Sequence, residues 1–520
     1  DLARQIGKSV RLNLTIYKTS VQSDFYRTQV IIHFPIHKLK MKKAILLYYP
    51  YLSAKNMRLP FYLLSIVVCI SSFLSHAQQK PKLESDSAFI RYVFDEALLR
   101  GEAYENLRSL CKDIGPRLTG SASAEMAIEW GVQRLKSYDF DRVYKQEIQV
   151  PHWERGTKEQ GWFKSPDGKI TKVNLLALGG SVGTDGSLEG EIVLFNHRKN
   201  LLAAERSQVE GKIVFIAQPM DQKMINTFRA YGGCYPIRGH GAVDAAKKGA
   251  KAVIIRSLSI SEHEHPHTGS MRYEEGTPLV PAAAISTKDA TMLENAILSS
   301  RLPYSFVMEM DCKKYPDLTS YNVIGEVKGS EFPDKIITVG GHLDSWDVGE
   351  GAHDDGAGIV HSMEALRILM KLGYQPRHTI RVVFFMNEEN GNRGGKSYAQ
   401  YAKESGLEHI AAIESDRGGF TPRGFDVDGS EEHLKLLRSF APLFKPYYLH
   451  HFENGYGGVD IGPLKDEFND IALFGFVPDS QRYFDFHHNA NDVFENVNKR
   501  ELHMGAGSIA SFIFLLDKYL

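Results

Sequence analysis

The stretch 339–358, which reads VGGHLDSWDVGEGAHDDGAG, constrains the fold of this chain more than any other. A β-branched run at 336–339 predicts a buried strand, and the glycines that follow end it. Two histidines and four aspartates then fall in the segment 342–355. Carboxylates so close together repel one another unless a cation or hydrogen-bond donors compensate them. The stretch is therefore either a solvated acidic loop or one wall of a metal site.

The rest of the C-terminal half alternates strands with helices. Apolar periodicity predicts strands at 335–339, 380–386, 409–414 and 471–476, and helices at 359–372, 395–403, 431–440 and 499–519. This alternation is typical of a mainly parallel, mixed sheet with helices on both sides, so the predicted fold class is α/β. In such sheets, functional residues lie beyond the carboxyl ends of the strands.

Acids or imidazoles come after all four of these predicted strands. They are His342 with Asp354 and Asp355, then Asn387-Glu388-Glu389, then Glu414-Ser415-Asp416, and finally His487-His488 with Asp492. Taken singly, such residues carry little information, because an acidic pair is often a solvated turn and an aspartate often caps a helix. The same residue types at four strand ends indicate one shared site.

The residue types in these segments indicate the metal. Imidazole and carboxylate groups without a cysteine thiolate suit zinc and, less well, cobalt or manganese. Five such ligands, fewer than the strand ends offer, would already be too many for one catalytic zinc ion with an open position. They fit two ions that share a carboxylate and a water, as in two-metal hydrolases.

The N-terminal region differs from the rest of the chain. Residues 57–77 begin with Met-Arg, continue with an apolar run at 59–74 and end in Ser-His-Ala, which predicts a signal peptide cleaved after Ala77. The run is short for a spanning helix, although a retained anchor is the alternative. Residues 1–56 are predicted to be an upstream extension without a fold of its own. The predicted localisation is therefore secreted or periplasmic, with no membrane span after cleavage.

Charge and cysteine content exclude some classes of protein. The net charge of −1 gives no support for nucleic-acid binding, which needs a basic surface. After residue 77 three cysteines remain, Cys111, Cys234 and Cys312, and their spacing fits neither a zinc ribbon nor a paired framework. The sequence does not indicate whether any two of them are bridged.

Residues 179–311 form a segment of different character. Short strands are predicted at 191–195, 212–216 and 250–255, with a helix at 242–249. Three alternating histidines at 263, 265 and 267 are expected in a solvated loop, although such a pattern can bind metal. We interpret the segment as a module inserted into the catalytic domain, with no chemistry of its own.

The motifs together resemble a known family. They are GGHLDSWD at 340–347, HDDGAG at 353–358, NEE at 387–389, ESD at 414–416 and FHH at 486–488. This set resembles the co-catalytic di-zinc exopeptidases, and among them the plasma glutamate carboxypeptidase (carboxypeptidase Q) type. The resemblance implies an α/β zinc-exopeptidase fold in two parts, 78–178 and 312–520. It also implies that 179–311 is a protease-associated domain rich in β-strands, with 210–215 as its recognisable strand.

The resemblance assigns a role to each site residue. His342 and Asp416 would hold one zinc ion, Glu389 and His488 would hold the other, and Asp354 would bridge both. Glu388 would be the general base that takes a proton from the bridging water. His488 is preferred to His487 because the motif's acid, Asp492, falls four residues later.

Four less central predictions accompany this assignment. Asp344 would orient the His342 imidazole. His353 would be a loop residue that lines the pocket. The peptide bond between Asp354 and Asp355 would be cis. Tyr456, in the segment GYGGVD, resembles a tyrosine that donates its hydroxyl to the developing oxyanion in related aminopeptidases, with simple packing as the alternative.

The predicted function is that of an exported metallo-exopeptidase acting on dipeptides or short peptides. An aminopeptidase on longer peptides is the nearest alternative. A catalytically dead, receptor-like homologue should have lost Glu388 or a ligand, and this chain has lost none. A glutaminyl cyclase relative would use one zinc ion and lack the inserted module. Residue preference is not predicted, and a homodimer is expected only because dimers are common in the family.

Overall fold

The computed structural model describes residues 85–520 and, before them, the backbone of three strands: β1 (Asn13–Thr19), β2 (Arg27–His33) and β3 (Ile45–Leu47). No fold is predicted for this upstream extension, whereas these three segments, rich in β-branched residues, pair as an antiparallel sheet. The predicted signal peptide at 57–77 lies outside the described residues. Residues 81–520 form a separate unit, which is described by itself below.

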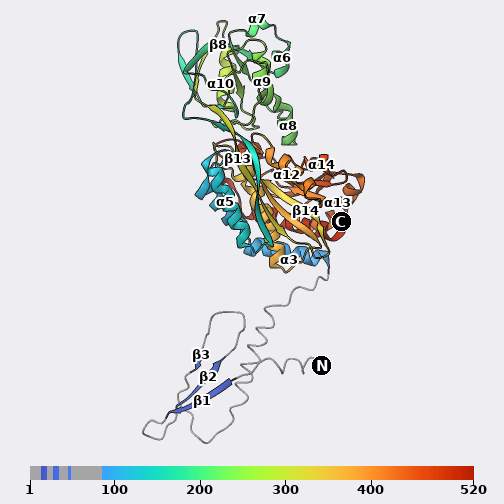
Figure 1. The fold of residues 1–520 in the computed structure, drawn as a ribbon. Helices are drawn as coiled ribbons and strands as arrows, with labels where there is room; N and C mark the ends of the chain where they lie inside the picture. Colours follow the sequence, from blue (N-terminus) through green and yellow to red (C-terminus); the bar gives the residue numbers. More distant parts are fainter. Residues whose placement is uncertain (1–12, 20–26, 34–44, 48–84) are drawn as a thin grey trace. The chain divides into compact units, whose positions relative to one another are not determined.

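An eight-stranded sheet forms the core of one part of this unit (Figure 1). It is called the catalytic sheet below, because the candidate ligands predicted from the sequence follow its strands. Its strands, in spatial order, are β18 (His451–Asn454), β17 (Pro422–Asp428), β19 (Ala472–Pro478), β16 (Glu408–Glu414), β14 (Phe332–His342), β15 (His378–Phe385), β13 (Lys313–Val327) and β4 (Arg142–Glu154). The four strands from β19 to β15 run parallel, whereas β17 and β13 pair antiparallel to their inner neighbours. This confirms the predicted mixed, mainly parallel sheet.

Helices cover both faces of the catalytic sheet. They are α3 (Asp86–Arg100), α4 (Ala103–Ser109), α5 (Ala122–Ser137), α11 (Ala357–Lys371), α13 (Glu431–Phe444) and α16 (Lys499–Tyr519) on one face, and α12 (Arg393–Glu404) and α14 (Leu464–Glu467) on the other. Successive strand residues point to opposite faces. Accordingly, Val382 and Phe384 of β15 pack in the first cluster, and Val383 and Phe385 pack in the second. A strand buried on both faces explains why 380–386 is a continuous apolar run.

The last helix matches its prediction residue for residue. Both the sequence pattern and the structure place it at Lys499–Tyr519. It begins there because the side chain of Asn498 accepts hydrogen bonds from the backbone N–H groups of Arg500 and Glu501.

A second eight-stranded sheet forms the inserted unit. Its strands, in spatial order, are β6 (Ile170–Val173), β5 (Glu159–Lys164), β12 (Ser305–Met310), β8 (Ser187–Phe195), β9 (Ile213–Ile216), β10 (Ala252–Arg256), β11 (Ala282–Ile285) and β7 (Leu175–Ala177). The predicted boundary at residue 179 is too late, because β5, β6 and β7 pair within this sheet. An alternating pattern by itself does not specify which sheet a strand joins.

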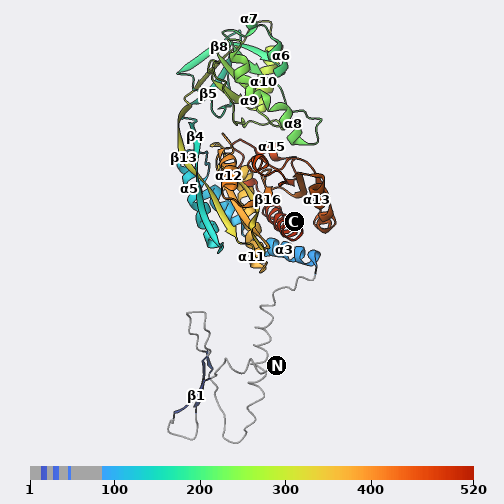
Figure 2. The same ribbon diagram turned by 45° about the vertical axis from the view of Figure 1, so that its right-hand side comes forward.

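The paired strands β4 and β13 connect the two parts of the chain. They pair antiparallel from Arg142 opposite Glu326 to Glu154 opposite Lys313. The chain enters the inserted unit from β4 and returns along β13 (Figures 1 and 2). Three helices of this unit matter below: α8 (Thr227–Cys234), α9 (Pro236–Ala246) and α10 (Thr287–Leu298).

The three cysteines after residue 77 are free and buried. Burial raises the pKa of each thiol, which keeps it in the neutral, unreactive form. Within the described residues, no helix is both long and apolar enough to cross a membrane.

Candidate metal centre

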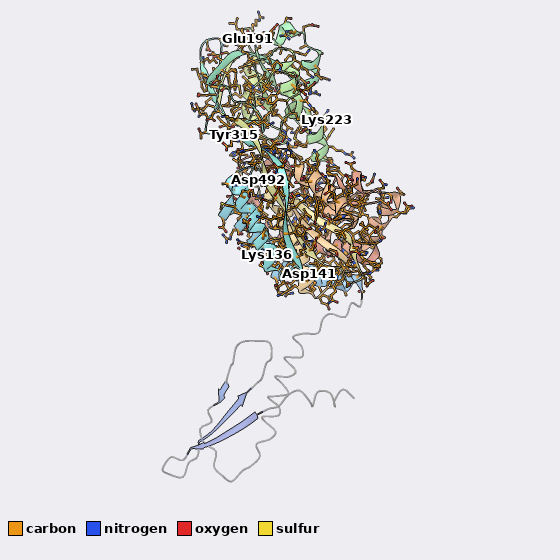
Figure 3. All side chains as sticks on the ribbon, viewed as in Figure 1. Lys136, Asp141, Glu191, Lys223, Tyr315 and Asp492 are labelled. Atoms are coloured by element: carbon orange, nitrogen blue, oxygen red, sulfur yellow. The ribbon has the colours of Figure 1, made fainter. Side chains whose placement is uncertain are left out.

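Five predicted ligands meet at one rim of the catalytic sheet. They are His342 at the end of β14, Glu389 after β15, Asp416 after β16, Asp354 in the turn η2 (Ala352–Gly356), and His488 after α15 (Tyr483–Phe486). The rim faces the inserted unit: Asp492 lies at that end of the catalytic part, whereas Asp141, just before β4, lies at the opposite end (Figure 3).

His342, Asp354 and Asp416 form the first half of the cluster. The Nε2 atom of His342 lies 3.1 Å from Oδ1 of Asp354 and 3.5 Å from Oδ1 of Asp416. Asp355 is close by, but its carboxylate accepts the backbone N–H groups of His342 at 3.1 Å and Gly358 at 2.9 Å. Asp355 therefore supports the loop, and Asp354 faces the site.

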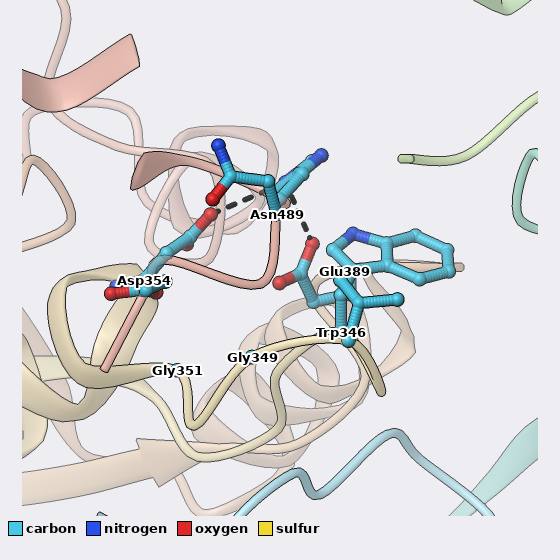
Figure 4. Close-up of a pocket in the computed structure, with 9 residues that line it drawn as sticks. Trp346, Gly349, Gly351, Asp354, Glu389 and Asn489 are labelled. Atoms are coloured by element: carbon cyan, nitrogen blue, oxygen red, sulfur yellow. Dashed lines mark hydrogen bonds and ion pairs between the residues drawn. The ribbon is translucent and has the colours of Figure 1, made fainter. Parts of the chain in front are cut away.

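His488, Asp354 and Glu389 form the second half. The Nε2 atom of His488 lies 3.2 Å from Oδ2 of Asp354 and 3.1 Å from Oε2 of Glu389 (Figure 4). The two oxygens of Asp354 thus face different imidazoles, one in each half. This is the geometry that a bridging carboxylate requires.

Three carboxylates of the cluster have a buried oxygen that no protein group compensates within the described residues. Oδ2 of Asp354, Oε1 of Glu389 and Oδ1 of Asp416 are buried and have no hydrogen-bond partner within the described residues. Buried carboxylate oxygens without partners are costly, so they are expected to coordinate something. The donors fit metal ions: His342, Asp354 and Glu389, for example, each offer a ligand atom within 4.8 Å of the others.

The orientation of His342 differs from the prediction. Its Nδ1 donates to the backbone carbonyl of Asp344 at 2.9 Å, which leaves Nε2 free to face the site. The Asp344 carboxylate is 3.8 Å from that ring and instead accepts the backbone N–H groups of Asn387 at 2.8 Å and Glu388 at 3.1 Å. The main-chain carbonyl of Asp344 therefore orients His342, and the side chain of Asp344 holds the turn that carries Glu388.

Loop 267–270 of the inserted unit holds His488 in place. Nδ1 of His488 lies 3.3 Å from the carbonyl oxygen of Thr268, and the N–H of Thr268 donates to the carbonyl of His488 at 3.0 Å. Ser270 donates its hydroxyl to the carbonyl of Glu389. Gly269 permits this approach, because a Cβ at that position would lie 2.6 Å from Nδ1 of His488. The expectation that the insertion carries nothing relevant to chemistry is therefore wrong.

Asp492 holds the backbone of the turn that carries Asp354. Its carboxylate accepts the backbone N–H groups of His353 at 2.7 Å and Asp354 at 3.1 Å. The peptide bond between Asp354 and Asp355 is cis, as predicted.

Two further histidines, His353 and His487, lie close to the cluster. His353 does not line the pocket: its ring stacks on Phe420 with centroids 4.2 Å apart, and its Nδ1 accepts from the N–H of Gly419. The ring of His487 stacks on that of His488 at 3.5 Å, and its Nε2 is 3.8 Å from Asp354 Oδ2. The contacts of His488 to Asp354 and Glu389 are shorter, which agrees with its choice over His487.

The ionisation of the cluster depends on its burial and crowding. Burial raises the pKa of Glu389 to about 7, with Asp354 adding to the effect. Burial also raises the pKa of Glu388 well above its usual range. Burial by itself would lower the pKa of His342, but Asp416 and Asp354 outweigh it and raise that pKa well above the ordinary value. Without a cation, the cluster therefore holds protons that a metal ion would displace.

A cleft of about 1260 Å³ opens over the cluster. Glu388, Glu389 and Asp416 line it from the catalytic sheet, and Tyr231 and Arg238 line it from the inserted unit. Tyr456 lines it too but is 55% exposed, and within the described part of the chain its hydroxyl makes no hydrogen bond. Sequence reasoning missed the residues from the inserted unit, since their spacing carries no motif.

Comparisons with known proteins identify the family of this chain. Residues 322–513 match the model of Peptidase family M28. Carboxypeptidase Q of Bos taurus is 34% identical over 418 residues, which cover 80% of this chain and 85% of that protein. Carboxypeptidase Q of Xenopus laevis is 35% identical over 419 residues, covering 80% and 86%.

Solved structures give the same result. A peptidase M28 precursor from Shewanella amazonensis has a TM-score of 0.79 and 34% identity, covering 83% of this chain and 96% of that one. The zinc aminopeptidase of Bacillus subtilis, at 20% identity and a TM-score of 0.55, shares the fold over 79% of this chain. The chain therefore belongs to peptidase family M28, is a metallopeptidase, and is similar to carboxypeptidase Q over most of its length.

Proposed function

We propose that the protein is an exported, zinc-dependent exopeptidase that hydrolyses dipeptides or short peptides. The observation that carries the proposal is the position of Asp354, whose two oxygens each face a different imidazole at 3.1 and 3.2 Å. His342 and Asp416 would hold one zinc ion, and Glu389 and His488 would hold the other.

Glu388 is the proposed general base. Two zinc ions, when bound, would hold and acidify a water between them. Glu388 comes after the strand β15 and lines the cleft. Its backbone N–H donates a hydrogen bond to the carboxylate of Asp344 at 3.1 Å. The Glu388 carboxylate takes a proton from the attacking water and returns it to the leaving amine.

Tyr456 is proposed as the donor to the developing oxyanion. Its hydroxyl has no protein partner in the described residues and lies on the cleft wall. Tyr456→Phe should lower kcat by about 100-fold if the hydroxyl stabilises the transition state. A change in thermal stability with unchanged kcat would instead indicate simple packing.

Export and dimerisation complete the proposal. The signal peptide at 57–77 predicts a mature chain that begins after Ala77, in the periplasm or outside the cell. N-terminal sequencing of the native protein tests this. Size-exclusion chromatography with light scattering tests the homodimer expected from the family.

The decisive experiment is hydrolysis of a dipeptide panel with free and blocked termini, with and without a chelator, alongside zinc analysis. We expect about two zinc ions per chain and chelator-sensitive cleavage of dipeptides. Cleavage of longer peptides only from the amino end would favour the aminopeptidase. Zinc binding without any hydrolysis would favour a receptor-like protein, and one zinc ion with cyclisation of N-terminal glutamine would favour a cyclase.

A further inference from the structure

The two halves of the candidate metal centre are supported by different parts of the chain. In the first half, the imidazole of His342 is oriented by the main-chain carbonyl of Asp344, which belongs to the catalytic part. In the second half, the imidazole of His488 contacts the main-chain carbonyl of Thr268, which belongs to the inserted unit. The orientation of His488 therefore depends on the junction between the inserted unit and the catalytic part.

Thr268 contacts His488 with both of its main-chain polar groups. Its N–H donates to the carbonyl of His488 at 3.0 Å, and its carbonyl oxygen lies 3.3 Å from Nδ1 of that imidazole. A histidine that binds a metal ion through Nε2 carries its proton on Nδ1, so Nδ1 would donate to this carbonyl. Nη1 of Arg238, on α9, donates to the same oxygen at 3.3 Å. The position of Thr268 thus sets the orientation of the ligand in the second half.

Arg155 connects Thr268 to the catalytic part. It is buried and lies directly after strand β4, where the chain enters the inserted unit. Its Nε and Nη2 atoms donate to the two carboxylate oxygens of Asp347 at 2.9 and 2.7 Å. Nη2 also donates to the hydroxyl of Thr268 at 3.3 Å, and that hydroxyl donates to the carbonyl of Ala177 at 2.8 Å.

The same guanidinium is bound to the sheet of the inserted unit. Nη1 of Arg155 donates to the carbonyl of Ala177 on β7 at 2.7 Å and to the carboxylate of Glu159 on β5 at 3.0 Å. Arg155 therefore joins three segments: the loop that carries Asp347, the inserted sheet and Thr268. Because the planar guanidinium fixes the directions of its five N–H donors, it holds these segments in one relative position.

We infer that Arg155 is a positioning residue of the metal centre, through which the junction controls zinc affinity in the His488 half but not in the His342 half. The inference rests on the proposed pair of zinc ions. Loss of a group that orients a histidine ligand weakens metal binding by about 10- to 100-fold. Zinc bound in the His488 half should in return stabilise the junction, because such coupling is reciprocal.

The test measures the zinc content and the dissociation constant of each ion, by competition with a chromophoric chelator, in the wild type, in Arg155→Met and in the matched control Arg198→Met. Arg198, on α6 (Arg198–Ala203), pairs with Asp244 at 2.6 Å, and both residues lie in the inserted unit. The wild type should bind about two zinc ions per chain. In Arg155→Met the dissociation constant of one ion should rise by about 10- to 100-fold, whereas the other constant should stay within about twofold of the wild type. Arg198→Met should leave both constants unchanged.

Two further backgrounds identify the affected ion. Asp416→Ala retains the His488 half, and in this background Arg155→Met should weaken zinc binding by the same factor. His488→Ala retains the His342 half, and in this background Arg155→Met should leave the zinc dissociation constant unchanged.

Three results would overturn the inference. The first is a wild type that binds only one zinc ion, and the second is an Arg155→Met variant with both constants unchanged. The third is equal weakening of both ions in Arg155→Met, or the same weakening in Arg198→Met, since either would indicate a general loss of stability. If Arg155→Met does not fold, Thr268→Val, which removes only the hydroxyl, takes its place: weakening confined to the His488 half supports the inference, and no change rejects it. The expected zinc pattern without hydrolysis of any peptide would reject the proposed function and leave this inference standing.

Discussion

The catalytic sheet and the sheet of the inserted unit share the same central arrangement but differ in the side chains at the ends of their strands. Both have four adjacent parallel strands, β15, β14, β16 and β19 in one and β8, β9, β10 and β11 in the other. In the catalytic sheet, these strands lead into imidazoles and carboxylates. In the inserted sheet, β11 leads into Ser286, whose hydroxyl caps helix α10 by accepting the N–H of Asp289.

The same backbone arrangement therefore brings loops together at one rim of each sheet, but it does not determine which side chains those loops carry. The carboxyl ends of parallel strands gather loops at one rim in both sheets. Only the catalytic rim carries side chains that face one another with unpartnered oxygens, as Asp354 and Glu389 do within the described residues. The inserted unit contributes through its loops instead, where Thr268 and Ser270 contact the residues of the centre.

Replacing Asp354, the proposed bridging residue, should have the largest effect on the candidate metal centre. Asp354→Ala removes an oxygen from each half of the cluster, so we expect loss of bound zinc and of all measurable peptidase activity. Zinc analysis after gel filtration, together with circular dichroism, checks that the loss is local. A variant that retains the wild-type zinc content would contradict the bridging role.

Replacing the proposed base should separate binding from catalysis. Glu388→Gln keeps the shape of the side chain but cannot accept a proton, so kcat should fall by about 10²- to 10⁴-fold while zinc remains bound. Stopped or continuous dipeptide assays on the zinc-loaded variant measure this. Turnover at the wild-type rate would eliminate Glu388 as the base.

Asp344 should have an intermediate effect, because it acts on the centre through other residues. Asp344→Asn replaces one acceptor with an amide donor that faces the N–H groups of Asn387 and Glu388. Activity or zinc affinity should fall by about 10- to 100-fold. An unchanged zinc dissociation constant together with unchanged kcat/KM would show that the turn holds its shape without this contact.

Zinc affinity should depend on pH in a defined direction. Zinc needs an ionised Glu389 and a neutral His342, but the pKa of Glu389 is raised to about 7 and that of His342 is raised well above its ordinary value. Both residues therefore bind protons in the metal-free protein at and below neutral pH, and zinc must displace them. Affinity should fall by up to about tenfold per pH unit for each displaced proton as the pH drops through 7. Calorimetry in buffers of different ionisation enthalpy would detect the released protons, and no release at pH 7 would contradict the assignment.

Ser286, which follows strand β11 of the inserted unit, should have the smallest effect on peptidase activity. Ser286→Ala removes the cap of α10 and should cost about 1 kcal/mol of stability, with kcat/KM within twofold of the wild type. Denaturant unfolding and a dipeptide assay give the two numbers. A large loss of activity would mean that the two rims are not as different as the structure indicates.

Much of the candidate site could be predicted from the sequence because it obeys a local rule. His342, Glu389 and Asp416 each lie at or just after the end of a strand, so the parallel sheet alone brings them together. The supporting contacts obey no such rule. Thr268 and His488 are 220 residues apart in the chain, and His342 is oriented by a main-chain carbonyl that has no residue signature. The assignment of 159–177 to the second sheet was missed for the same reason, since an alternating strand does not specify its partner.

The sequence by itself determined the α/β class and the helix at Lys499–Tyr519, because periodicity is a property of short segments. Strand-end position indicated where a site would form, and the resemblance to a known family selected five candidate ligands there. Only the tertiary structure decided which oxygen of Asp354 faces which imidazole, and that Asp344 holds the Glu388 turn. It also placed the buried Arg155 between Asp347 and Thr268. These features depend on distances between segments that lie far apart in the chain, and such distances are fixed only when the two sheets and their loops pack together.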